Sequence, residues 1–168
     1  SKNLWWCWNQ EAMDLFKSID KELWNALGKN PIALLDQLSY EQYLKLEKND
    51  KFLRQLDRVA ESFNEYMEEK KGRKGASIAY FCMEYGLDAS LKIYSGGLGI
   101  LAGDYLKESS DLNVNMTGIG LLYRFGYFNQ KLSGYGDQIA DYQPQDFMKI
   151  PAVPVRDILR TEHRFMKV

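Results

Sequence analysis

The feature that most constrains the fold of this chain is a nearly unbroken apolar run at residues 77–85 (SIAYFCMEY). Such a run is typical of a strand that is buried on both faces, as in a parallel sheet. A glycine-rich turn at residues 94–99, a helical pattern at residues 98–112 and a second apolar run at residues 114–123 follow it. This order predicts two parallel strands joined by a right-handed helical crossover. The residues predicted to face inward on that helix are Leu98, Leu101, Ala102, Tyr105 and Leu112.

The chain before this run shows helical patterns instead. Apolar residues recur at helical spacing across residues 10–27, and Gly28 is placed to end that helix. A second helix is predicted at residues 32–38, opened by a cap at Asn30 and a proline that fits the first helical turn. A third begins near Tyr40, where Ser39 and Gln42 form a capping-box pattern.

A longer helix is predicted from Asp50 onward, with a charged face opposite an apolar stripe. We expect the stripe to be buried, and its members are Phe52, Leu53, Leu56, Val59, Phe63, Tyr66 and Met67. A charged stretch with two glycines at residues 68–75 then marks the expected domain boundary. The sequence therefore predicts an α/β chain, with a helical region at residues 1–75 and a second domain at residues 76–168.

The last third of the chain predicts extended structure. Residues 127–128 and 138–142 are expected to form the two arms of a hairpin or a long excursion, around the turn residues 133–136 (SGYG). Residues 147–155 are predicted to be one more extended segment, because Pro151 and Pro154 exclude a helix there.

Composition excludes several function classes. The formal net charge is −1, which argues against nucleic-acid and anionic-membrane partners because both require a basic surface. Cys7 and Cys82 lie in apolar surroundings and are expected to be buried, reduced thiols. The single histidine, His163, has no cluster of further ligands, so no metal site is predicted. No apolar run is long enough to span a membrane, and a cytoplasmic location is the default expectation.

Three tryptophans near the start allow two interpretations. Trp5, Trp6 and Trp8 could form an aromatic platform for a sugar, or they could attach the following helix to a core. The second interpretation is favoured, because each indole ring buries a large area when it packs.

The turn at residues 94–99 is the strongest candidate for chemistry. A helix start offers unpaired N–H groups and the positive end of the helix dipole, and glycines let an anion approach the backbone. The turn matches neither the dinucleotide fingerprint nor the P-loop. It therefore indicates either a phosphate site or a loop that needs glycine only for its backbone geometry. The candidate phosphate-binding residues are Gly96, Gly97, Leu98 and Gly99.

Four features of the second half of the chain together resemble the α-glucan phosphorylases in order and spacing. They are Glu84, the turn at residues 95–99 (SGGLG), residues 118–120 (GIG) and residues 125–130 (FGYFNQ). The resemblance covers roughly residues 78–157. The earlier part of the chain, from NLWWCWN near the start to GKNP before the second helix, resembles the helical N-terminal extension of the shorter, mostly prokaryotic branch of that family.

This resemblance implies a glycosyltransferase of the GT-B type, in which two Rossmann-like domains face each other across a cleft. Residues 76–168 would be the first part of one such domain. The family carries pyridoxal phosphate and uses its phosphate group as the acid–base partner. Inorganic phosphate attacks the terminal unit of an α-1,4-glucan, and α-glucose 1-phosphate is released with retention. By position, the glycine turn would lie against the substrate phosphate and glucose, and Glu84 would lie near the cleft.

The chain also departs from the family pattern. The segment with the cofactor lysine lies far downstream in the family and has no counterpart in this sequence, so no catalytic residue is assigned and the isolated chain is expected to be inactive. Residues 158–168 do not resemble the family's continuation. Glucan length preference, effectors and a homo-oligomeric state remain open.

Two other functions stay open. Nucleotide-sugar glucan synthases carry a similar glycine turn, but a lysine stands where this chain has Tyr94, and Lys92 is out of register. The other alternative is a non-catalytic domain that binds glucan or docks onto partner subunits.

Overall fold

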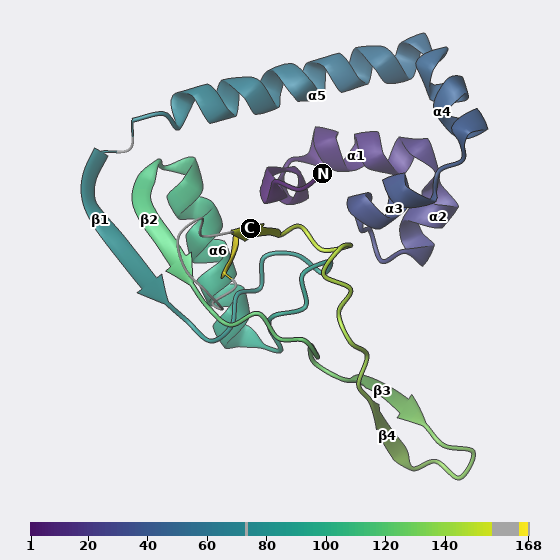
Figure 1. Ribbon diagram of the computed structural model, residues 1–168, viewed down its shortest axis with the longest axis vertical. Helices are drawn as coiled ribbons and strands as arrows, with labels where there is room; N and C mark the ends of the chain where they lie inside the picture. Colours follow the sequence, from purple (N-terminus) through teal and green to yellow (C-terminus); the bar gives the residue numbers. More distant parts are fainter. Residues whose placement is uncertain (73, 156–164, 168) are drawn as a thin grey trace. The chain divides into compact units, whose positions relative to one another are not determined.

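A computed structural model describes residues 1–72, 74–155 and 165–167. The chain divides into two compact units, which Figure 1 draws in the colours of the sequence. The first, here the helical unit, comprises Ser1–Gly72 and Lys149–Val168, and the second, the sheet unit, comprises Arg73–Met148. His163 and most of residues 158–168 lie outside the described residues.

The helical unit begins with a short 3-10 helix and continues with five α-helices. They are η1 (Leu4–Trp8), α1 (Gln10–Ile19), α2 (Lys21–Ala26), α3 (Pro31–Gln37), α4 (Tyr40–Glu47) and α5 (Asp50–Glu69). Two short antiparallel strands, β5 (Val153–Val155) and β6 (Phe165–Lys167), complete it.

Local capping signals fix most of these helix boundaries. Asn30 accepts hydrogen bonds from the first turn of α3, with proline at the first helical position, as the sequence predicts. The capping box at the start of α4 is also present, since Ser39 and Gln42 bond each other's backbone N–H groups. Gly28 has a φ of +62°, a conformation that glycine adopts without steric cost.

The single helix expected over residues 10–27 is wrong, because the structure has two helices there. Asp20 takes an extended conformation with a φ of −158° and interrupts the helix. Its carboxylate then accepts a hydrogen bond from the N–H of Leu23 at 2.9 Å. An N-cap aspartate satisfies donors that a helix start leaves unpaired, and this new start explains the break.

Aromatic rings form the core of the helical unit. Its buried members are Trp5, Trp6, Ala12, Trp24 and Leu34. The ring of Phe16 stacks on that of Trp24 with a centroid distance of 6.0 Å. The prediction that the N-terminal tryptophans belong to a core is therefore confirmed for Trp5 and Trp6, whereas Trp8 is half-buried. Cys7 and Cys82 take part in no disulfide among the described residues, and both are half-buried rather than buried.

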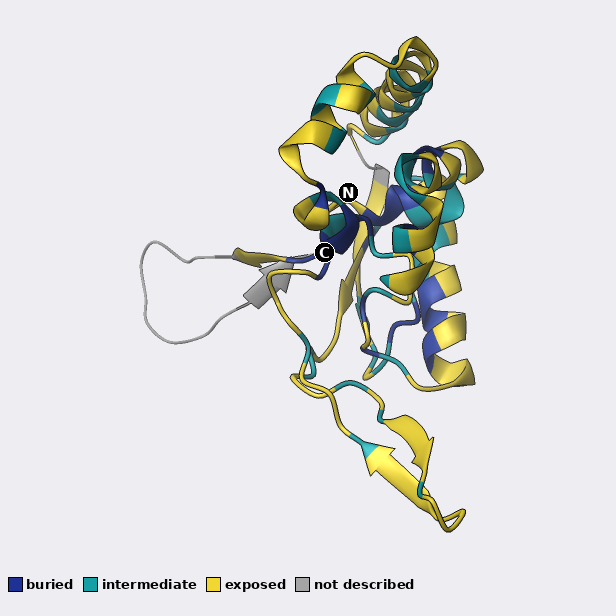
Figure 2. Ribbon diagram, turned by 90° about the vertical axis from the view of Figure 1, so that its right-hand side faces the viewer, coloured by how far each residue is buried: buried dark blue, intermediate teal, exposed yellow. Residues whose placement is uncertain are grey.

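The apolar stripe of α5 is covered only in part, which corrects the expectation of a buried face. Val59, Phe63 and Tyr66 pack against the aromatic core, but α5 has no fully buried residue. Leu56 and Met67 are 40% and 42% exposed. Figure 2 shows this helix mostly in the colours of exposed and half-buried residues.

The sheet unit contains the predicted strand–helix–strand element. Strand β1 (Lys74–Phe81) pairs in parallel with β2 (Val114–Ile119), and α6 (Gly97–Asp111) connects them. A hairpin follows, in which β3 (Asn129–Leu132) pairs with β4 (Gln138–Asp141) in antiparallel fashion. The hairpin is almost wholly exposed (Figure 2). Its first arm begins after the predicted residues 127–128.

Burial in this unit differs from the expectation. The run at residues 77–85 ends its strand at Phe81, and that ring is 71% exposed rather than buried on a covered face. On α6, Ala102 is buried as predicted, but the other four residues expected to face inward are more than half exposed. They are Leu98, Leu101, Tyr105 and Leu112. The sheet has two strands, so little neighbouring structure is present to cover these side chains.

The aromatic core predicts a stability effect at Leu34, which is fully buried. Leu34→Ala should lower the free energy of unfolding of the helical unit by about 3 kcal/mol, because it removes buried methyl groups and leaves a cavity. Tryptophan fluorescence during urea unfolding measures this unit alone, since all four tryptophans lie within its first 24 residues. Leu56→Ala is the matched control, with an expected loss below about 1 kcal/mol. Equal losses in the two variants would contradict the described core.

Candidate functional site

The start of α6 presents backbone donors that have no acceptor within the helix. Gly96 is the N-cap residue and has no side chain to cap the helix. The first helical hydrogen bond runs from the N–H of Ile100 to the carbonyl of Gly96 at 3.1 Å. The N–H groups of Gly97, Leu98 and Gly99 precede that bond and have no acceptor within the helix. Together with the helix dipole they favour a negative charge at this point.

Space in front of the first two glycines is open. A Cβ atom placed on Gly96 or Gly97 would meet no atom within 4 Å. Leu98 is 55% exposed. The backbone at the helix start is therefore accessible to a ligand.

Gly99 and Gly103 serve a different purpose, because both are packed against other backbone. A Cβ on Gly99 would lie 2.5 Å from the Cβ of Tyr94, and one on Gly103 would lie 2.3 Å from the carbonyl oxygen of Gly86. The N–H of Gly86 donates to the carbonyl of Gly99 at 2.7 Å. The structure thus separates the glycines of this region into an open pair and a packed pair.

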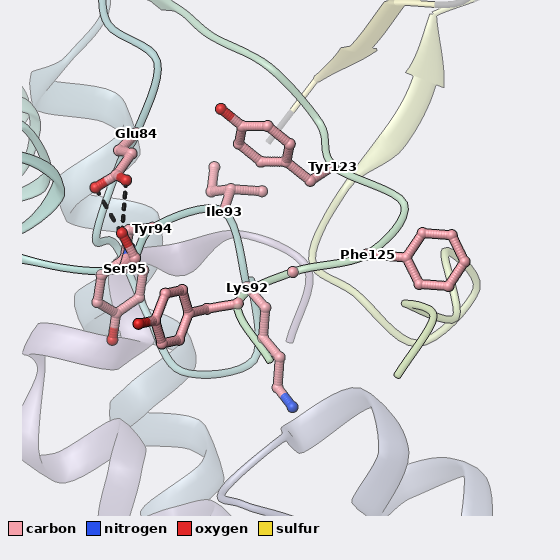
Figure 3. A pocket seen from close by; sticks show the side chains of 9 residues that line it. Glu84, Lys92, Ile93, Tyr94, Ser95, Tyr123 and Phe125 are labelled. Carbon is pink, nitrogen blue, oxygen red and sulfur yellow. Dashed lines mark hydrogen bonds between the residues drawn. The ribbon is translucent and has the colours of Figure 1, made fainter. Parts of the chain in front are cut away.

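Glu84 lies at the same helix start and holds the turn. The hydroxyl of Ser95 donates to its Oε1 at 2.7 Å, and the N–H of Ser95 donates to its Oε2 at 3.3 Å (Figure 3). These hydrogen bonds, first that of the hydroxyl, lower the pKa of the Glu84 carboxyl, and the N–H groups of Gly96 and Gly99 act in the same direction. The contacts that hold the turn to Glu84 are therefore hydrogen bonds from Ser95.

An open pocket of about 200 Å³ adjoins the turn (Figure 3). Its lining combines aromatic rings with one carboxylate and one ammonium group. The lining residues are Glu84, Lys92, Ile93, Tyr94, Ser95, Tyr123, Phe125, Gly126 and Tyr127.

Sequence reasoning missed three residues that shape this region. Gly103 stands four positions after Gly99, and two small residues at that spacing on one helix face are a signal for close packing. Ser95 directly precedes the glycines, but its bond to Glu84 depends on a residue 11 positions away. Gln145, whose side chain contacts Lys92, lies 53 positions from it and carries no local signal.

The described residues contain no group of three or more His, Cys, Asp or Glu side chains that could hold a metal ion. No described helix combines the length and the apolar character needed to cross a membrane.

Residues 1–91 match a family model described as "Protein of unknown function (DUF3417)". The chain belongs to this family. It is also 41% identical over 154 residues to the maltodextrin phosphorylase of Thermococcus litoralis. The aligned segment covers 86% of this chain and 18% of that protein. The glycogen phosphorylase of Mycobacterium tuberculosis is 40% identical over 163 residues, covering 90% and 19% of the two chains.

The glycogen phosphorylase of Aquifex aeolicus is 38% identical over 168 residues, covering 98% of this chain and 24% of the relative. The chain therefore spans about a fifth of the length of these relatives. No solved structure matches it. These matches confirm the resemblance to α-glucan phosphorylases that the sequence motifs indicate. The DUF3417 family corresponds to the N-terminal region of such proteins.

The two kinds of glycine predict opposite effects of the same substitution. Gly103→Ala should lower the stability of the sheet unit by about 1–3 kcal/mol, because the new Cβ forces α6 away from Gly86. Gly97→Ala should leave stability unchanged or raise it by up to about 1 kcal/mol, because alanine is the better helix former and meets no atom. Native-state hydrogen exchange of amides in α6 and β2 measures both. A destabilised Gly97→Ala variant would show that its surroundings are not open.

The lowered pKa of Glu84 predicts a pH-dependent contribution to stability. A carboxylate whose pKa is lower in the folded state stabilises the fold above its ordinary value of 4.5, and this contribution is lost as pH falls through the lower folded-state pKa. Glu84→Gln should therefore destabilise the turn at neutral pH, and its difference from the wild type should shrink below pH 4.5. Hydrogen exchange around the turn checks this. Asp104→Asn on α6, which removes a carboxylate outside the turn, is the charge control at neutral pH.

Proposed function

We propose that this chain is the N-terminal part of an α-1,4-glucan phosphorylase, which transfers a terminal glucosyl unit to inorganic phosphate and yields α-glucose 1-phosphate. The observation that carries the proposal is the 38–41% identity to maltodextrin and glycogen phosphorylases over 86–98% of the chain. The isolated 168 residues lack the cofactor lysine segment that the resemblance implies, so we propose that they are inactive alone.

Within this function, the open glycines are the proposed phosphate site. The N–H groups at the start of α6 have no helical acceptor, and no Cβ shields Gly96 or Gly97. Donors fixed in this way stabilise a phosphate whose charge changes during transfer, without having to reorganise. The site comprises Gly96, Gly97, Leu98 and Gly99, with Gly99 also needed for packing against Tyr94.

The fit of pyridoxal phosphate to this chain is partial. The open glycine turn suits a phosphate group, but the chain supplies no lysine segment of the type that attaches the cofactor in the family. When bound, the cofactor's phosphate supplies the acid–base group of the reaction. The role proposed for this chain is to bind and orient phosphate at the start of α6, while Glu84 and Ser95 hold the turn in place.

The finer architecture is part of the same proposal. The parallel pair of β1 and β2 with α6 between them suits the beginning of a Rossmann-like, GT-B type domain at residues 76–168, preceded by a helical region at residues 1–75. Partners would be α-1,4-glucan and inorganic phosphate, and the proposed location is the cytoplasm.

The alternative function, a nucleotide-sugar glucan synthase, differs from a phosphorylase in the substrate that it requires. With glucan and inorganic phosphate, a phosphorylase releases glucose 1-phosphate, whereas a synthase requires a nucleotide sugar and releases a nucleotide. The aromatic side chain of Tyr94, where the synthases carry a lysine, favours the phosphorylase.

Gly97→Val in the full-length protein tests the phosphate site. The branched side chain blocks the approach of an anion to the N–H groups, and losing such donors costs about a hundred- to a thousandfold in turnover. The expected result is that loss, together with a weaker dependence on inorganic phosphate, measured as the rate of glucose 1-phosphate release.

The matched control is Gly134→Val in the hairpin loop, where a Cβ also meets no atom within 4 Å. Circular dichroism and cofactor absorbance show whether each variant folds and keeps its cofactor. If Gly97→Val folds, keeps its cofactor and turns over as the control does, the glycine turn is structural only.

A further inference from the structure

Helix α5 is long and only partly covered. It runs for 20 residues, and none of its side chains is fully buried. One side of the helix contacts the aromatic core, where the rings of Phe63 and Tyr66 lie 5.4 Å and 6.0 Å from that of Trp5. This contact orients α5 within the helical unit and leaves the adjacent sides of the helix exposed to solvent (Figure 2).

A row of apolar residues follows one of these exposed sides. Its members, here called the α5 row, are Leu53, Leu56, Ala60, Phe63 and Met67, at alternating intervals of three and four residues. Leu56 is 40% exposed, Met67 is 42% exposed and Ala60 is also exposed. Such spacing keeps a row on one side of a helix, and it is the spacing at which two helices pack side by side. The α5 row is therefore suited to contact another helix.

The α5 row is nearly symmetric about Ala60. Leu53 stands seven positions before Ala60 and Met67 stands seven positions after it, with Leu56 and Phe63 between them. If two copies of α5 lie antiparallel with Ala60 at the centre, Leu53 of one copy meets Met67 of the other. The small side chain of Ala60 lets the two helix axes approach closely at the crossing point. Apolar residues thus meet apolar residues along the whole row.

The charges of α5 favour the same antiparallel arrangement. Its first ten residues carry three basic and two acidic side chains, whereas its last ten carry four glutamates and no basic side chain. Parallel pairing would place the glutamates of one helix beside those of the other. Antiparallel pairing places them beside the half that contains Lys51 and Arg54, and it also aligns the two helix dipoles favourably. A second copy of α5 is therefore complementary in both apolar pattern and charge.

We propose that the α5 row is an interface between two copies of this protein, related by a twofold axis near Ala60. Each copy uses the same surface in such a contact, so this face closes a dimer and cannot extend it into a filament. The inference involves neither the glycine turn nor a substrate, and it is independent of the proposed function.

Leu56→Glu in the full-length protein tests the α5 row. Sedimentation velocity over a range of protein concentrations gives the Kd of self-association, and the wild type should be a dimer. The substitution should raise that Kd by at least about thirtyfold, because the new carboxylate enters the interface twice. Leu132→Glu is the matched control, since this leucine of β3 is 72% exposed and lies in the sheet unit. The control should change the Kd by less than about twofold.

Single cysteines test the antiparallel arrangement in the same protein. Ala60→Cys places a thiol at the proposed twofold axis, so mild oxidation should join two copies by a disulfide. Glu65→Cys is the control, because this exposed position lies on the charged side of the same helix. The wild type shows any link that Cys7 and Cys82 form. A non-reducing gel should show a covalent dimer for Ala60→Cys alone.

The results decide between a second copy and the other possible occupants of the α5 row. A wild type that stays monomeric overturns the proposal, and a loss of stability in monomeric Leu56→Glu would then show that a segment of the same protein covers the row. A dimer that Leu56→Glu leaves intact also overturns it, and separation of that dimer by Leu132→Glu would place the contact at the hairpin. Weakening without a link at residue 60 overturns the antiparallel arrangement. If Leu56→Glu does not fold, the link at residue 60 decides alone.

Discussion

The arrangement around the candidate site depends on the close approach of α6 to the loop that follows β1. Gly86 donates its N–H to the carbonyl of Gly99 at 2.7 Å, and the Cα of Gly103 lies where any Cβ would come within 2.3 Å of the Gly86 oxygen. A side chain at Gly103 would push helix and loop apart. Because they remain in contact, Glu84 in the loop meets Ser95 directly before the helix. The carboxylate, the turn and the helix start therefore keep one geometry.

The neighbouring Tyr85 links the same loop to the sheet. It is 4% exposed, its hydroxyl donates to the carbonyl of Tyr80 in β1, and burial raises the pKa of that hydroxyl. A Cβ at Gly120 would come within 2.8 Å of its ring, and Gly118 also lies close to it. The glycines at the end of β2 thus leave room for the Tyr85 ring. Tyr85 contacts the two strands and the next residue, Gly86, contacts α6, so strand pairing and helix packing are linked through two consecutive residues.

Local features of the fold could be predicted from the sequence, whereas burial was predicted correctly only in part, as at Trp5, Trp6 and Ala102. The caps at Asn30 and Ser39 involve residues within a few positions, so their patterns are sufficient. Whether Phe81 or Leu101 is covered depends on layers that a local pattern does not specify, and both are about 70% exposed. At the candidate site, the helix start and its glycines were predictable, but the separation into open and packed glycines depends on where Gly86 lies.

The charges around the turn divide the site into two parts with different preferences. The N–H groups of Gly97 and Leu98 stand at the positive end of the helix dipole and favour an anion. The Glu84 carboxylate, bonded to Ser95, faces the adjoining pocket and favours a neutral ligand that donates hydrogen bonds. Phosphorolysis brings an anion and a neutral sugar together, and holding two reactants side by side removes much of the entropic barrier to their reaction. A single turn between Glu84 and α6 thus has the electrostatic asymmetry that the proposed reaction requires.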